Sequence, residues 1–277
     1  MLVTSRPILI YIIVETNQVV YIMSLKFKQF KWADIEFDEI ETIESTEPGQ
    51  PRIYKTPAGD FPSMTSILSI LDDGGLDSWI KRIGKEEADR ICQDAINRGN
   101  QLHDTNELYL RNKLTRDMIK GQGGILFNRV KKYLDEIELV VACEVALYSK
   151  ELKYAGRTDC IGVIDDKLMI IDHKNSRREI DLSKPYARKK IFGYMVQISG
   201  YKKALLEMTG LDATHGCLIV GNHINSTASR FIFEIDDLLL DELEKVAIFY
   251  STGMINREEL NFFQIGKVNE NFPRISK

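Results

Sequence analysis

Residues 156 to 174 decide the fold. They read Gly156-Arg157-Thr158-Asp159-Cys160-Ile161-Gly162-Val163-Ile164-Asp165-Asp166-Lys167-Leu168-Met169-Ile170-Ile171-Asp172-His173-Lys174. Two strand-like runs flank Asp165-Asp166, which suits a two-residue hairpin loop because aspartate tolerates positive φ. Ile164 then pairs with Lys167, and the same register places Asp159 directly opposite Asp172. A three-residue loop would shift this pairing by one residue.

The two facing aspartates predict a metal site. Carboxylates directly opposed on neighbouring strands repel each other, and a divalent cation between them removes the repulsion while gaining the oxygen ligands that Mg²⁺ prefers. Strand alternation places Lys174 on the same face as Asp172, where an ammonium group can hold a water and stabilise charge on a phosphodiester. His173 points to the opposite face, although its backbone carbonyl can still be a ligand. The alternative for Asp159, Asp172 and Lys174 is an ordinary ion-pair cluster at a sheet edge.

Composition places the chain among ordinary globular proteins. It has 277 residues, 44% hydrophobic and 28% charged, which suffices for one substantial core. The net charge of −4 excludes a global basic footprint for nucleic acid, so only a local basic groove can bind it. Such a concentration of cations occurs at Lys184–Lys190, with Arg177 and Arg178 nearby, although a solvated helix face is the simpler interpretation. The four cysteines form no Cys-x-x-Cys pair, which argues against a zinc knuckle and favours a reducing cytoplasm.

The N-terminal segment, residues 1–50, is predicted to be an extension to a single domain at 51–277. The apolar run Pro7–Val14 is too short to span a membrane, and no cleavage site of a secretory signal follows it. Two β-rich runs around Thr16-Asn17 favour a hairpin. The alternative is a native start at Met23, with the preceding residues dispensable. The sequence does not choose between these two interpretations.

The remaining patterns predict an α/β domain with a mixed central sheet and helices on both faces. We expect a small hairpin at 52–61, a helix beginning at Ser63 or Thr65, helices in pieces over 76–111 and at 123–138, strands at 140–149, 154–164 and 168–174, a helix at 185–209, strands at 216–221 and 230–235, and a helix at 236–252. Gly210 is expected to end the long helix.

Three further motifs accompany these strands in a fixed order. They are Arg98-Gly99-Asn100-Gln101-Leu102-His103 followed by Glu107, then Gly156-Arg157-Thr158-Asp159, and finally Gln197-Ile198-Ser199-Gly200-Tyr201. Together with Asp172-His173-Lys174, they resemble the PD-(D/E)XK nuclease superfamily, which has a restriction-endonuclease-like core. The closer resemblance is to its RecB-like exonuclease branch, which includes phage exonucleases and the mitochondrial genome maintenance exonuclease. Each motif alone is weak, but the combination, spanning about residues 50 to 205, is specific.

The resemblance implies roles at the matching positions. Asp159 and Asp172 would bind Mg²⁺ or Mn²⁺, Lys174 would be the catalytic lysine, and His103 would contact a metal or the scissile phosphate. Glu107, one turn further along the helix, could orient His103, and a solvated glutamate is the equal alternative. Acidic Glu144 on the preceding strand would be an additional ligand or support one. DNA contacts would come from Gln197, Tyr201, Arg177, Arg178, Arg188, Lys189 and Lys190.

The resulting expectation is a metal-dependent DNA exonuclease, acting on single-stranded DNA or DNA with free ends. By resemblance it would work in the cytoplasm of a bacterial or phage-infected cell, in replication, recombination or turnover, without a membrane partner. One alternative is an endonuclease of the same superfamily, because the same metal chemistry serves both modes. Another is a non-catalytic DNA-binding protein that retains the fold, although a binding module has no need of opposed carboxylates.

Overall fold

The predicted hairpin around Asp165-Asp166 is present. The computed structural model describes residues 10–15, 18–23, 27–43, 51–265 and 272–276. In it, β8 (Tyr154–Ile164) and β9 (Lys167–Ser176) pair antiparallel, with Ile164 opposite Lys167. The turn residues Asp165 and Asp166 have φ values of +50° and +59°, the positive values that a two-residue turn matched to strand twist requires. The predicted register is therefore confirmed.

The two strands of this hairpin separate before they reach the aspartates. Their ladder ends at the pair Cys160–Ile171. Beyond it, β8 continues against β7 (Leu139–Ser149) as far as Tyr154. Meanwhile β9 continues in parallel with β10 (His215–Asn222) as far as Ser176. Asp159 and Asp172 thus lie one position past the last β8–β9 pair, where the sheet divides.

The central sheet has seven strands in the order β12-β11-β10-β9-β8-β7-β3. The strands not yet given are β3 (Lys31–Trp32), β11 (Ala228–Glu234) and β12 (Ile275–Ser276). The β9–β10 and β3–β7 pairs are parallel and the other neighbours are antiparallel, so the sheet is mixed, as expected.

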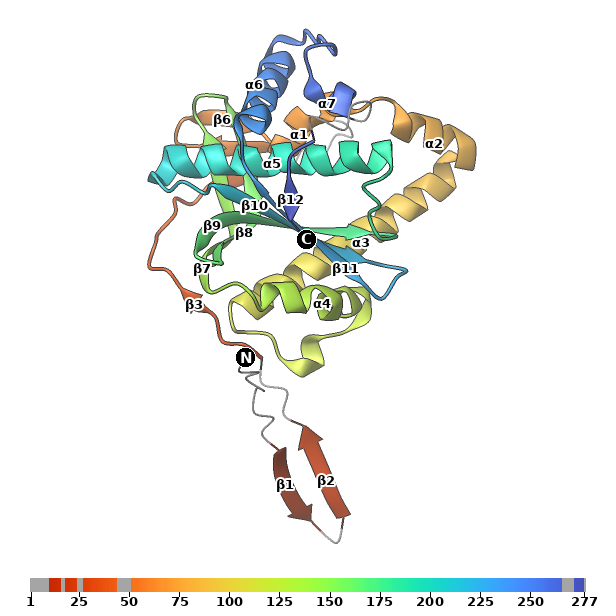
Figure 1. The fold of residues 1–277 in the computed structure, drawn as a ribbon, viewed down its shortest axis with the longest axis vertical. Helices are drawn as coiled ribbons and strands as arrows, with labels where there is room; N and C mark the ends of the chain where they lie inside the picture. The colour runs from red at the N-terminus through yellow and green to blue at the C-terminus, as the bar shows by residue number, and fades with distance from the viewer. Residues whose placement is uncertain (1–9, 16–17, 24–26, 44–50, 266–271, 277) are drawn as a thin grey trace.

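Helices cover both faces of this sheet (Figure 1). On one face lie α1 (Met64–Ile67), the 3₁₀ helix η1 (Leu68–Leu71), α5 (Pro185–Thr209), α6 (Asp237–Thr252) and α7 (Asn261–Ile265). On the other lie α3 (Lys85–Leu110) and α4 (Gly121–Leu134). Strand alternation divides the core accordingly: Ile170 packs in the cluster that includes α5, whereas Ile171 packs with α3 and α4.

The ends of the helices follow local sequence signals. Helix α2 (Gly75–Ile83) stops at Gly84, whose φ of +88° separates it from α3, so the stretch 76–111 is helical in pieces as predicted. Helix α5 begins with Pro185 and ends at Gly210, which has the expected left-handed φ of +74°. A short 3₁₀ helix, η2 (Arg116–Met118), links α3 to α4.

The N-terminal region contains strands that the sequence analysis did not predict. In the extension, β3 pairs with β7 of the main sheet, and the Lys28 ammonium donates to the Asp135 carbonyl at 2.6 Å. A separate three-stranded sheet joins β4 (Glu41–Ile43) to the predicted hairpin of β5 (Ile53–Thr56) and β6 (Gly59–Pro62).

The expected N-terminal hairpin is present. Strand β1 (Ile10–Glu15) pairs antiparallel with β2 (Gln18–Met23), and these are the two strands at the foot of Figure 1. The turn at Thr16-Asn17 lies outside the described residues.

Buried Glu242 connects α6 to α7 and provides a test of the fold. Its carboxylate accepts the backbone N–H groups of Asn261 at 2.7 Å and Phe262 at 2.8 Å, and burial raises the pKa of Glu242. We expect Glu242→Gln to lower the free energy of unfolding by about 1–2 kcal/mol, because one of the two N–H groups loses its acceptor. Urea denaturation measures this, with exposed Glu244→Gln on the same helix as the control. Equal midpoints for the two variants would contradict the assigned role.

Candidate active site

Asp159 connects three elements at the point where the sheet divides. Its Oδ2 accepts the backbone N–H of His173 on β9 at 2.5 Å, and its Oδ1 lies 3.2 Å from Nδ1 of His103 on α3. The side chain is only about 10% exposed. One carboxylate thus spans the gap that opens between β8 and β9 and reaches the helix across it.

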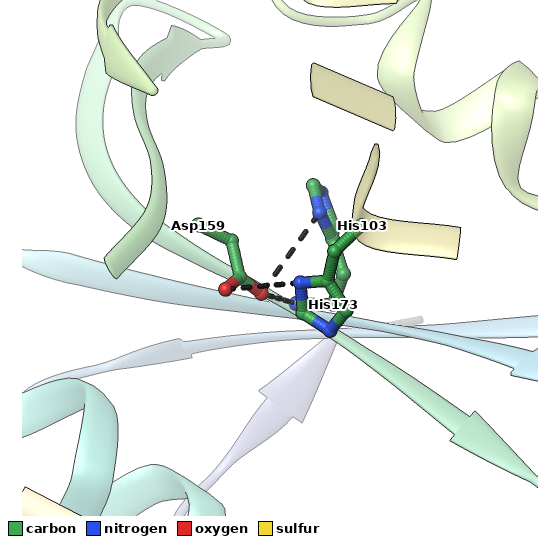
Figure 2. A group of neighbouring side chains, drawn as sticks. All are labelled: His103, Asp159 and His173. Carbon is green, nitrogen blue, oxygen red and sulfur yellow. Dashed lines mark hydrogen bonds and ion pairs between the residues drawn. The ribbon is translucent and has the colours of Figure 1, made fainter. Parts of the chain in front are cut away.

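His103, Asp159 and His173 form a group with the geometry of a metal site. One ligand atom from each lies within 4.8 Å of the others, and the three side chains converge in Figure 2. His173 Nδ1 is 3.9 Å from Asp159 Oδ2, and the two imidazole rings are 6.1 Å apart. His173 Nε2 is buried without a hydrogen-bond partner. The expected ligand atom of His173 is its backbone carbonyl, whereas in the structure its imidazole also belongs to the group.

The charges within this group are distributed unequally. Burial by itself would lower the pKa of His103, but the Asp159 carboxylate beside it raises that pKa to about 10. Burial would conversely raise the pKa of Asp159, yet His103 holds it well below its usual range. Burial lowers the pKa of His173 to about 4, so its ring is neutral near pH 7. A neutral imidazole has a lone pair available to a ligand.

Asp172 and Lys174 form a buried ion pair on the other face of β9. The Lys174 Nζ donates to Asp172 Oδ1 at 2.8 Å and lies 2.7 Å from Oδ2. Lys174 is therefore on the same face as Asp172, as strand alternation predicts. Burial raises the pKa of Asp172 to about 6 against the opposing effect of Lys174. Burial would lower the pKa of Lys174, but Asp172 and Asp159 together raise it.

The two aspartates are arranged differently from the simple cross-strand pair that was expected. Asp159 is directed to His103 and the backbone of His173, whereas Asp172 is directed to Lys174. Among the described residues, the three-membered group with metal-ligand spacing omits Asp172. The physical reason is the separation of β8 from β9 one pair earlier, which releases the carboxylates from direct opposition.

Glu144 is a second carboxylate neighbour of His103. Its Oε1 lies 3.8 Å from His103 Nδ1, and burial raises the pKa of Glu144. Glu144 adopts a left-handed φ of +52°, a conformation that costs a non-glycine residue about 1–3 kcal/mol. It lies between the β7–β8 pairs Cys143–Cys160 and Val145–Thr158.

Glu107 has a partner other than His103. Glu107 instead accepts a hydrogen bond from Arg111 Nε at 2.7 Å, and Arg111 donates from Nη2 to the Cys143 carbonyl at 2.9 Å. Arg111 lies four residues after Glu107 on the same helix, so its guanidinium reaches this carboxylate. The bond from Arg111 to the Cys143 carbonyl connects α3 to β7.

Gln197 and Tyr201 support the site from α5. Both are buried, and Gln197 Nε2 donates to the Tyr201 hydroxyl at 3.0 Å. Burial and the nearby Asp172 raise the pKa of Tyr201. A Cβ at Gly156 would lie 2.8 Å from the Tyr201 ring, so this glycine of β8 allows the ring to lie against the strand. Tyr201 therefore lies close enough to interact electrostatically with Asp172 and Lys174, and Gln197 holds its hydroxyl group.

The predicted DNA-binding cations fall into two groups. Arg188 donates to the carbonyls of Leu182 and Ser183, and Lys189 pairs with Asp73 at 3.2 Å, so these two have internal partners. Arg177, Arg178 and Lys190 are exposed.

The comparisons with known proteins give a relative that is named as an exonuclease. No family model matches the chain. The chain is similar to "Mitochondrial genome maintenance exonuclease 1" from Xenopus tropicalis, with 27% identity over 215 residues, which cover 72% of this chain and 60% of that protein. The match thus spans less than two thirds of its relative. A solved structure titled "Crystal structure of SSO0001" covers 75% of this chain and 77% of its own, at 13% identity and a TM-score of 0.30, too low to support an argument.

Within the described part of the chain, no helix has the length and apolar character that a membrane-spanning segment requires.

Proposed function

We propose that the chain is a divalent-metal-dependent DNA exonuclease of the PD-(D/E)XK superfamily. The observation that carries this proposal is the arrangement of Asp159, Asp172 and Lys174 around the divided sheet, with two histidines beside Asp159. The similarity to a protein named as an exonuclease supports the same reaction class.

The residues present fit a divalent metal ion. The Asp159 carboxylate and the neutral His173 ring, whose Nε2 has no hydrogen-bond partner, offer oxygen and nitrogen donors, and His103 adds a second nitrogen once a bound cation displaces its proton. Asp172 Oδ2 is buried and accepts no hydrogen bond, although the Lys174 ammonium lies close to it. Imidazole donors favour a transition ion, so this set fits Mn²⁺ better than Mg²⁺, which prefers oxygen ligands alone.

The chain's own groups can position a phosphodiester for hydrolysis. A divalent cation held by these donors would act as a Lewis acid toward the phosphate. Lys174 presents a fixed positive charge, because Asp172 holds its ammonium at 2.8 Å. That ammonium can donate a hydrogen bond to a phosphate oxygen. It can also donate one to the water that attacks phosphorus as the leaving oxygen departs. Glu144 and Asp159 fix the imidazole of His103 on the other side.

Removal of divalent ions tests this proposal. We expect EDTA to lower the rate of nucleotide release from end-labelled DNA by about 10³-fold or more, because it removes the Lewis acid. Restoration should be greater with Mn²⁺ than with Mg²⁺. Digestion of end-labelled single- and double-stranded DNA in each ion measures this. Undiminished cleavage in EDTA, or no cleavage in either ion, would refute the proposal.

A closed circular DNA separates the exonuclease from the endonuclease alternative. An exonuclease needs an end and should leave the circle intact, whereas it should degrade the same DNA after linearisation. Cleavage of the intact circle in Mn²⁺ would instead assign an endonuclease with the same metal chemistry.

A further inference from the structure

A groove of about 600 Å³ begins where β9 ends. Its walls come from α2, from the loop that follows β9 and from the first turns of α5. Ser176, two residues beyond Lys174, lines its inner end, and Trp79 of α2 and Tyr186 of α5 are its two aromatic residues. Figure 1 shows α2 beside the N-terminal end of α5, so the groove lies at one end of the helix that supports the ion pair. None of the motifs that predicted the site includes Trp79 or Tyr186.

The exposure of Tyr186 is unusual for an aromatic residue. Its relative exposure is 72%, which leaves most of the ring in solvent. Trp79 is half-buried and also lines the groove. Exposed aromatic rings in a concave, charged surface are typical of sites that stack the bases of unpaired nucleic acid.

A stripe along α5 connects this groove to the active site. Tyr186, Lys190 and Tyr194 follow each other at intervals of four residues, which places them on one face at steps of about 6 Å along the axis. The Lys190 ammonium lies 5.9 Å from the Tyr194 ring, and the Lys174 ammonium lies 5.2 Å from the same ring. Aromatic rings and cations therefore alternate from Tyr186 to Lys174.

The charges of the groove suit a phosphate backbone. Arg177, Arg178 and Lys190 line it and are exposed. Glu179 and Asp181 also line it, so three cations face two carboxylates. Asp181 accepts the Ser183 amide at 2.9 Å within its own loop. Cations near aromatic faces are the combination that holds single strands, with phosphates on the cations and bases on the rings.

We propose that this groove is a subsite for unpaired nucleotides, which stacks their bases on Tyr186 and Trp79 and pairs their phosphates with Arg177, Arg178 and Lys190. The proposal rests on the proposed nuclease function and adds to it two aromatic residues, Tyr186 and Trp79, that hold the bases of an unpaired strand beyond the cleavage site. A base inside a duplex is covered on both faces by its neighbours, so it cannot stack on these rings. The stripe on α5 then leads the strand to Lys174.

Tryptophan fluorescence tests the stacking without any hydrolysis. The chain has two tryptophans, Trp32 and Trp79, so a Trp32→Phe variant leaves Trp79 as the sole reporter. In EDTA, a single-stranded thymidine oligonucleotide should quench Trp79 emission. An abasic strand of the same length and a blunt duplex should not quench it. Equal quenching by the abasic strand or the duplex would overturn the proposal.

Affinity measurements on variants separate stacking from charge. Tyr186→Ala should weaken binding of the thymidine strand by between about fivefold and a hundredfold, while leaving affinity for the abasic strand unchanged. Tyr186→Phe should restore binding, because it retains the ring. Met254→Ala, at an equally exposed residue (71%), is the control and should have no effect. An equal loss of affinity for both strands in Tyr186→Ala would overturn the subsite.

The two proposals fail in different experiments. Hydrolysis by the wild-type chain in Mn²⁺, with Tyr186→Ala binding both strands as the wild type does, would overturn the subsite alone. Base-dependent binding without hydrolysis in any divalent ion would overturn the nuclease function while supporting the subsite.

Discussion

Replacing Asp172 with asparagine is expected to lower phosphodiester hydrolysis by about 10³-fold or more, leaving only residual activity. Asp172 is 1% exposed, and its carboxylate holds the Lys174 ammonium at 2.8 Å. Asparagine keeps the shape but removes the charge, so the ammonium loses both its anchor and its neutralising partner. Loss of one member of a buried ion pair also destabilises by about 3–5 kcal/mol, so folding must be measured in parallel.

The control for this variant lies on the same hairpin. Asp165→Asn removes one carboxylate from the turn, where asparagine also tolerates the φ of +50°. We expect Asp165→Asn to retain full activity. Lys174→Met, which keeps the length of the side chain, should be as inactive as Asp172→Asn. Initial rates on end-labelled DNA and circular dichroism at the assay temperature provide the two measurements. A folded Asp172→Asn or Lys174→Met protein with wild-type rates would remove the catalytic assignment.

Gly123→Ala is expected to lower the free energy of unfolding by about 3 kcal/mol, without removing any charged or catalytic group. A Cβ at this position of α4 would lie 2.5 Å from Gln101 Cβ and 2.7 Å from the Gln101 carbonyl oxygen on α3. These atoms belong to the backbone or are fixed to it, so the two helices must move apart. Gln101 precedes His103 by two residues, so this movement also displaces a side chain of the candidate active site.

The same substitution at Gly193 is a matched control of opposite sign. A Cβ there would meet the Phe262 ring at 3.8 Å, an ordinary van der Waals contact in the middle of α5. Alanine favours a helix interior over glycine, so Gly193→Ala should stabilise the protein by about 0.5–1 kcal/mol. Urea denaturation of the two variants and the wild type measures the difference. Similar midpoints for the two variants would contradict the helix contact at Gly123.

Local signals made much of the fold predictable. The turn Asp165-Asp166 fixes the register of β8 and β9, because only positive φ at both positions matches the twist of the strands. Pro185 and Gly210 bound α5 at its predicted residues. By contrast, β3 and β4 are only two and three residues long. Their pairing depends on distant partners, so the sequence around them carries no periodic signal.

The site was predictable where strand alternation alone decides it. The pair of Asp172 and Lys174 follows from a spacing of two residues on one strand. The meeting of His103 with the His173 ring depends on where α3 crosses the sheet, which is a tertiary contact that no local pattern encodes. The pairing of Glu107 with Arg111, by contrast, follows a local pattern, because the two residues lie four positions apart on one helix.

The division of the sheet at Cys160–Ile171 has a mechanical consequence. Asp159 belongs to β8, which is hydrogen-bonded to β7. Asp172 belongs to β9, which is hydrogen-bonded to β10. Beyond the Cys160–Ile171 pair, the Asp159 carboxylate links the two strands by accepting the His173 amide. A small movement of one strand pair against the other would therefore change the distance between Asp159 and Asp172 without breaking a backbone hydrogen bond within either pair.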